Sequence, residues 1–144
     1  MRTEGYLKAL KLNNIEIDTN LIIKIEDIEN FETQVQDLLQ NNQIDALFAV
    51  NELFAVTAIK TAIKMGKRVP EDLSVIGFTD GIISKYSSPA ITTVSQNGIL
   101  MGEKAAKMLI DRLESEEVEF NEHYQEQYTT EVIETELVER ESTL

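Results

Sequence analysis

Hydrophobic and polar residues follow two patterns along this chain, one with helical spacing and one made of short apolar runs. The helical spacing predicts helices over residues 2–12, 28–40, 52–65 and 97–114. The short runs predict strands over residues 21–25, 44–50, 73–78 and 91–94, and a weak alternation after residue 128 predicts one or two late strands. Strands that alternate with helices are typical of βαβ units, so we expect an α/β fold, a parallel-sheet, Rossmann-like subdomain.

The third predicted helix has the clearest boundaries. Asn51 stands where an N-cap is expected, and Glu52 falls in the first turn, where a negative charge complements the helix dipole. Gly66 follows the last apolar residue and is expected to end the helix. Farther along, Gly77 interrupts a predicted strand, which indicates close approach of another backbone.

The composition is that of an ordinary water-soluble domain. With 144 residues, 42% of them hydrophobic, the chain can form one compact domain with a core. No apolar stretch approaches the ~20 residues that cross a bilayer, and the mixed, charged N-terminus is unlike a signal peptide. We therefore expect a cytoplasmic protein with no membrane partner. The absence of cysteine excludes disulfides and thiolate chemistry.

The charge balance argues against nucleic-acid binding by this chain alone. Affinity for nucleic acid comes largely from Lys and Arg side chains that neutralise phosphates. Here 26 acidic residues oppose 13 basic ones, which gives a net charge of −13, and no segment is basic. Part of the acidic excess lies over residues 114–126, which we interpret as a solvated helix end and loop.

Polar side chains follow two predicted strands at the points where ligands bind in parallel α/β sheets. Asn51 follows the second strand, and Thr79 and Asp80 follow the third. An amide and a carboxylate at one sheet edge could hold a polyhydroxylated small molecule. By residue chemistry alone, however, Asn51 is better explained as a helix cap and Asp80 as a turn residue.

Enzyme chemistry finds little support in the sequence. The single histidine, His123, lies in a Glu- and Tyr-rich segment and has no partner at the spacing of a metal site or a catalytic triad. The Gly66-Lys67 pair lacks the upstream glycine of a phosphate loop. We therefore expect no catalytic residue, no metal and no cofactor, and we predict that the chain is not an enzyme.

Several motifs resemble those of LacI/GalR-type transcription regulators. The longest covers residues 45–81, where an apolar strand, Asn51 and an alanine-rich helix lead into GKRVPEDLSVIGFTD. Three further stretches are similar to family motifs and occur in the family's order: RTEGY at 2–6, PAITTVSQ at 89–96 and TELVEREST at 135–143. The resemblance covers nearly the whole chain.

The resemblance implies a type I periplasmic-binding-protein-like fold, with a small effector in the cleft between two α/β subdomains. Family effectors are mostly sugars or sugar derivatives and sometimes nucleobases. A homodimer and a helix-turn-helix head that reads operator DNA are also implied. By position, Arg2 and Asn51 match effector-contacting residues, Thr79 takes the place of an effector-binding aspartate, and Asp80 matches the residue after it.

Two departures from the family pattern concern the effector. Thr79 in place of aspartate removes a charge-assisted acceptor, so a hydroxyl held there is held more weakly. Gly98 stands where many relatives place a side chain against the ligand, so stacking from that position is absent. Both departures favour an effector that is larger than a plain hexose or differently oriented.

We interpret residues 1–144 as the C-terminal effector-binding and dimerisation region. No helix-turn-helix head and no N-terminal subdomain precede Arg2, so we expect operator DNA to be bound only through a head absent from this chain. In the family, the helix after Gln96 returns to the N-terminal subdomain, and residues 97–118 are expected to do the same. Without that subdomain its apolar face is exposed, so we expect a homodimer or a swapped arrangement.

Two other functions stay open. A periplasmic-type solute-binding protein for sugar uptake shares the fold, although the charged N-terminus and the motif at 69–78 favour a regulator. A small enzyme would need an acid–base pair at one strand edge.

Overall fold

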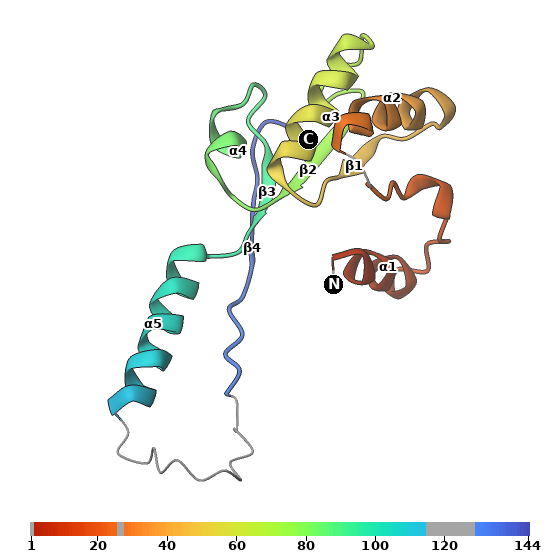
Figure 1. Ribbon diagram of the computed structural model, residues 1–144. Coiled ribbons are helices and arrows are strands. Elements are labelled where there is room, and N and C mark those ends of the chain that lie inside the picture. The colour runs from red at the N-terminus through yellow and green to blue at the C-terminus, as the bar shows by residue number, and fades with distance from the viewer. Residues whose placement is uncertain (1, 26–27, 115–128) are drawn as a thin grey trace.

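The computed structural model describes residues 2–25, 28–114 and 129–144. The helices are α1 (Arg2–Leu12), α2 (Phe31–Asn41), α3 (Glu52–Lys64), α4 (Ile82–Tyr86) and α5 (Gly98–Glu114), with short 3-10 turns η1 (Thr19–Leu21) and η2 (Ile28–Asn30). The strands are β1 (Ala46–Phe48), β2 (Ser74–Phe78), β3 (Thr92–Ser95) and β4 (Glu136–Val138). Figure 1 shows their arrangement.

The strands form one sheet in the order β1-β2-β3-β4. The first three strands are parallel, with Phe48 opposite Ile76 and Gly77 opposite Thr93. Strand β4 runs antiparallel to β3. The expected α/β fold with a mostly parallel sheet is confirmed, and the carboxyl ends of β1 and β2 meet at one edge.

Helix α3 packs directly on β2, and α2 packs on α3 (Figure 1). The core is apolar and comes mainly from these three elements: Phe31, Val35, Leu39, Ala55, Ala58, Ile59, Ala62, Leu73 and Val75. Small side chains along α3 let it approach the sheet closely. A β-carbon added at Gly77 would lie 3.3 Å from both Ala55 Cβ and Ile91 Cγ2, so the close neighbours of this glycine are side chains and not the expected backbone.

The C-terminus is fastened between β2 and β3 by Ser142, which is completely buried. Its hydroxyl donates to Val75 O at 2.6 Å and accepts from Thr92 N at 2.8 Å. Its backbone carbonyl accepts from Val75 N, and its own N–H donates to Ala90 O. Because each of these polar groups has a partner, burying the serine adds no uncompensated desolvation cost.

The predicted strand over residues 21–25 is wrong. The Asp18 carboxylate accepts from Asn20 N at 2.9 Å and caps η1, so the chain turns over Thr19–Leu21. Ile23 and Ile25 then pack against the core without joining the sheet. Together with α1, α2 and β1, this segment lines an apolar cavity of about 180 Å³.

The other boundaries differ less. Of the predicted late strands, only β4 forms among the described residues, and Tyr128 lies outside them. The short helix α4 was not predicted, since the residues after Thr79 were interpreted as a turn and a loop. The expected acidic loop over 115–126 and His123 also lie outside the described residues.

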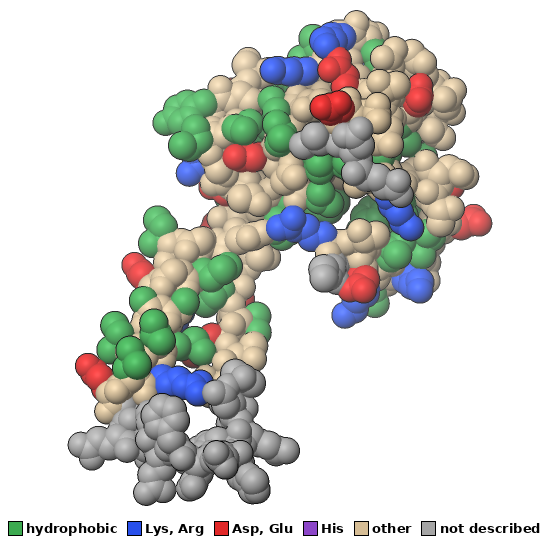
Figure 2. Space-filling model, in the orientation of Figure 1, with side chains coloured by type: hydrophobic (Ala, Val, Ile, Leu, Met, Phe, Trp, Pro, Cys, Tyr) green, Lys and Arg blue, Asp and Glu red, His purple; other side chains and the backbone are tan. Residues whose placement is uncertain are grey.

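Helix α5 extends away from the sheet beside residues 129–138 (Figure 1). Lys104 Nζ lies 3.6 Å from Glu131 Oε2, and Asn97 Nδ2 donates to Glu134 O, so the two segments form one arm. None of the α5 side chains is buried. Hydrophobic side chains therefore cover much of the arm's surface in Figure 2. Among the described residues, no helix combines the length and apolar character that crossing a bilayer requires.

We predict that Gly77→Val lowers the free energy of unfolding by about 1–3 kcal/mol, because the added methyl groups overpack the contact between β2 and α3. Urea denaturation measures the change. Gly5→Ala is the matched control, since nothing lies within 4 Å of a β-carbon at Gly5 and alanine favours the helix. If Gly77→Val and wild type were equally stable, the contact between β2 and α3 would have room for a larger side chain, and the prediction would be wrong.

Candidate functional site

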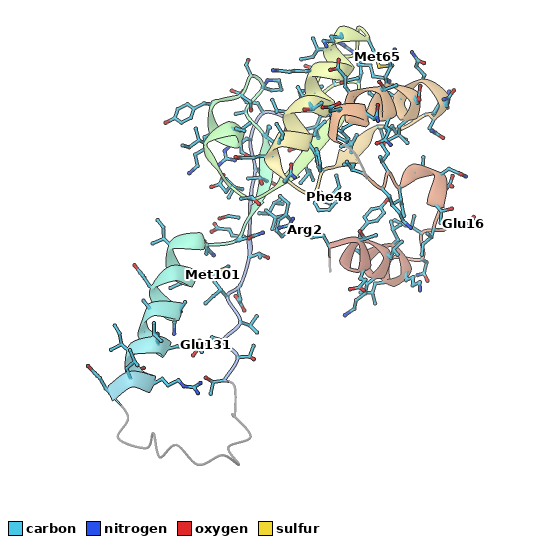
Figure 3. All side chains as sticks on the ribbon, viewed as in Figure 1. Arg2, Glu16, Phe48, Met65, Met101 and Glu131 are labelled. Carbon is cyan, nitrogen blue, oxygen red and sulfur yellow. The ribbon has the colours of Figure 1, made fainter. Side chains whose placement is uncertain are left out.

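The carboxyl ends of β1 and β2 are joined by Arg2, the first described residue of α1. Arg2 Nη1 donates to Val50 O at 2.9 Å, and its guanidinium carbon lies 4.3 Å from the ring centre of Phe78. Phe48 and Phe78 meet edge to face, with ring centres 6.4 Å apart. Figure 3 shows Arg2 and Phe48 at this edge. Since Val50 precedes Asn51 and Phe78 precedes Thr79, Arg2 lies at the same edge as Asn51 and Thr79.

Asn51 is the N-cap of α3, as predicted. Its backbone is extended, and Oδ1 accepts from Phe54 N at 2.8 Å. The amide group Nδ2 has no hydrogen-bond partner among the described residues. The capping role therefore occupies the oxygen of the side chain and leaves two N–H donors for a ligand.

Thr79 follows β2 in a left-handed conformation, with φ of +82°. A β-branched residue is rare there, and such strain costs about 1–3 kcal/mol. Hydrogen bonds fix this geometry: Thr79 N donates to Val94 O at 3.0 Å, and its carbonyl accepts from Thr93 Oγ1 and Ser84 Oγ. The side chain is exposed at the edge, where its hydroxyl can meet a ligand.

Asp80, the fourth predicted residue, lies beside a cation. Its Oδ1 is 2.5 Å from Arg140 Nη2, and its Oδ2 is 3.6 Å from Lys85 Nζ. Only 17% of the Asp80 side chain and 16% of the Arg140 side chain are exposed. Both carboxylate oxygens thus face positive charges of the protein itself.

Glu52 is a residue whose role the sequence did not reveal. Its Oε2 accepts from both Ser84 N and Ser84 Oγ at 3.2 Å, so the first turn of α3 holds the start of α4. It also fills the space beside Gly81, where the Glu52 carboxylate leaves no room for a β-carbon. The position was interpreted only through the helix dipole, and its partner lies 32 residues away.

The edge therefore offers mainly donors: the Arg2 guanidinium, the Asn51 amide and the Thr79 hydroxyl. No group of three or more His, Cys, Asp or Glu side chains in the described part of the chain could hold a metal ion. Donors at the carboxyl ends of parallel strands define an α/β domain of the ligand-binding class.

Comparison with known proteins agrees with this class. Residues 1–143 match the family model described as a periplasmic binding protein-like domain. The chain belongs to this family and matches part of the effector-binding domain of LacI/GalR-type regulators. These relatives are transcription regulators and not enzymes, in agreement with the prediction.

Three relatives illustrate the likeness. The regulator MalR of Clostridium butyricum is 38% identical over 143 residues, which are 98% of this chain and 40% of MalR. The repressor PurR of Yersinia pestis is 37% identical over 116 residues, 79% of this chain and 34% of PurR. The regulator CelR, solved with cellobiose, is 32% identical with a TM-score of 0.78, over 98% of this chain and 41% of CelR. The chain thus spans about 40% of the MalR relative's length.

We predict that Asn51→Ala lowers the free energy of unfolding by about 1 kcal/mol, because Phe54 N loses its acceptor. Asn51→Asp keeps an acceptor for this N–H and should cost much less. Thermal unfolding followed by circular dichroism compares the two variants. Equal losses in both would mean that the amide donors, and not the cap, stabilise the free protein.

Proposed function

We propose that this chain is the part of a LacI-type regulator that receives a small effector at the edge formed by Arg2, Asn51 and Thr79. The position of Arg2 carries the proposal. One guanidinium contacts Val50, the residue before Asn51, and Phe78, the residue before Thr79. Such converging donors suit the oxygens of a bound small molecule.

We propose a sugar or sugar derivative as the effector. Sugar hydroxyl groups accept hydrogen bonds from the donors at this edge, and the C–H face of a sugar can pack against the exposed ring of Phe48. The CelR relative was solved with cellobiose, which supports this class. The PurR relative makes a purine the alternative, and the aspartate-to-threonine change at Thr79 leaves fewer acceptors for either ligand.

The arm supports a second proposal, which concerns the domain organisation of the whole protein. Residues 97–118, of which 115–118 lie outside the described residues, would cover an N-terminal subdomain with the apolar face of α5. Operator DNA would be read by a head beyond these 144 residues, because the net charge of −13 opposes phosphate binding. The whole regulator would act in the cytoplasm.

We predict that cellobiose or maltose shifts the amide resonances of residues 50–52 and 79–81 in a heteronuclear NMR titration, and that Arg2→Ala weakens this binding at least tenfold, about 1.4 kcal/mol. The variant loses both a charge-assisted donor and the contact with Phe78. NMR detects the weak binding expected of one half of a cleft.

Lys8→Ala is the control, since Lys8 is an exposed cation on the same helix. Hypoxanthine serves as the purine probe, and shifts with hypoxanthine alone would replace the sugar by a purine. A ligand that binds wild type and Arg2→Ala equally would contradict the site.

We also propose that this chain by itself, with no N-terminal subdomain to cover α5, forms a homodimer through that helix. The side chains of Ile99, Leu109 and Leu113 are 82%, 59% and 74% exposed, and exposed apolar faces of this kind find partners. Light scattering after size exclusion should give twice the mass of 16.3 kDa for wild type. Leu109→Asp with Leu113→Asp should give a monomer.

A control places the same charge on another apolar surface. Ile82 and Tyr86 of α4 are 75% and 83% exposed. Ile82→Asp with Tyr86→Asp should leave the dimer intact. If this variant dissociates and the α5 variant does not, the interface lies on α4, and monomeric wild type would overturn the dimer altogether.

A further inference from the structure

Asp80 and Arg140 form an ion pair that joins the turn after β2 to the chain after β4. The two residues are 60 positions apart, and both side chains are largely shielded from solvent. The guanidinium has a second partner, because Arg140 Nη1 donates to Ile91 O at 2.8 Å. An ion pair with this degree of burial and added hydrogen bonds holds its geometry better than an exposed one.

The backbone of Arg140 is itself fixed. Its N–H donates to Thr92 Oγ1 at 2.8 Å, and the same hydroxyl lies 3.2 Å from Arg140 O. Thr92 is buried in β3. The guanidinium therefore reaches Asp80 from a backbone that is anchored to the centre of the sheet.

The turn that Asp80 belongs to needs support from its surroundings. Thr79 has a left-handed backbone, and the Glu52 carboxylate fills the space at Gly81. Glu52 approaches from α3, whereas Arg140 approaches from the C-terminal segment. The two ends of the turn are thus held by different parts of the chain.

We infer that Asp80 is a positioning residue and that its ion pair with Arg140 couples the Thr79 edge to the arm. This inference rests on the proposed function, because it takes Thr79 as a residue that contacts the effector. Asp80 then pairs with Arg140 and does not contact the effector itself. Strand β4 ends two residues before Arg140, and Asn97, the residue before α5, contacts Glu134. A shift of the Thr79 turn on ligand binding would therefore reach both segments of the arm through one ion pair.

A double-mutant cycle distinguishes a positioning role of the Asp80–Arg140 pair from direct contact between Asp80 and the ligand. The variants are Asp80→Asn, Arg140→Met and both together, with cellobiose as the titrated probe. If Asp80 positions Thr79, each single variant weakens binding about tenfold, and the double variant is no weaker than the singles. If Asp80 contacts the sugar itself, Arg140→Met frees the carboxylate and keeps or raises the affinity, which would overturn the inference.

Amide hydrogen exchange gives a readout that needs no effector. In Asp80→Asn, exchange should speed up together at Thr79 N, which donates to Val94 O, and at Arg140 N, which donates to Thr92 Oγ1. Val75 N in the core should be unchanged in a folded variant. Unchanged exchange at Thr79 or Arg140 would overturn the coupling.

Two further variants distinguish the loss of the Asp80–Arg140 ion pair from the loss of any positive charge near Asp80. Lys85→Met removes the more exposed cation near the same carboxylate, at 3.6 Å, and should change neither readout. Arg140→Lys keeps the charge and should restore part of the protection lost in Arg140→Met. If no sugar or purine binds wild type, the proposed function fails, while the exchange measurements still decide whether the pair couples the two segments.

Discussion

The close approach of helix α3 to strand β2 is the constraint on which the rest of the structure depends. Gly77 and Ala55 face each other with no room for a larger side chain, and the small residues of α3 extend this contact along the strand. Close packing fixes where the strand ends relative to where the helix begins. The same contact therefore sets the position of Asn51, at the helix start, relative to Thr79, just after the strand.

Once these two ends are fixed, polar groups at the edge must find partners or solvent. Most of the backbone groups at the edge have partners. Thr79 N and O bond to β3 and α4, and Ser84 N donates to the Glu52 carboxylate. Such groups cannot move without leaving buried polar atoms unpaired. The groups left over are side-chain donors, those of Asn51 and Arg2, so the edge is rigid in its backbone and open in its side chains.

Local chemistry explains which parts of this arrangement could be predicted from the sequence. The cap at Asn51, the end of α3 near Gly66 and the strands around Val75 and Thr93 depend on residues within a few positions of each other, and all were predicted. The placement of Arg2 came from a family resemblance and not from any local pattern. The pairs Asp80–Arg140 and Glu52–Ser84 join residues 60 and 32 positions apart, so no spacing rule could indicate them. The apolar run at 21–25 was mistaken for a strand because burial alone does not distinguish a sheet strand from an extended segment packed against the core.

The strain at Thr79 gives the edge a further property. A β-branched residue in the left-handed region persists only where the surroundings overdetermine it, and here three hydrogen bonds and an adjacent ion pair do so. Relaxation of the turn would release that strain while it breaks the contacts to β3, so a ligand could favour a relaxed turn only through contacts that offset those lost. Since the next residue pairs with Arg140, which follows β4, the strained turn lies where a bound molecule would have the shortest connection to the arm.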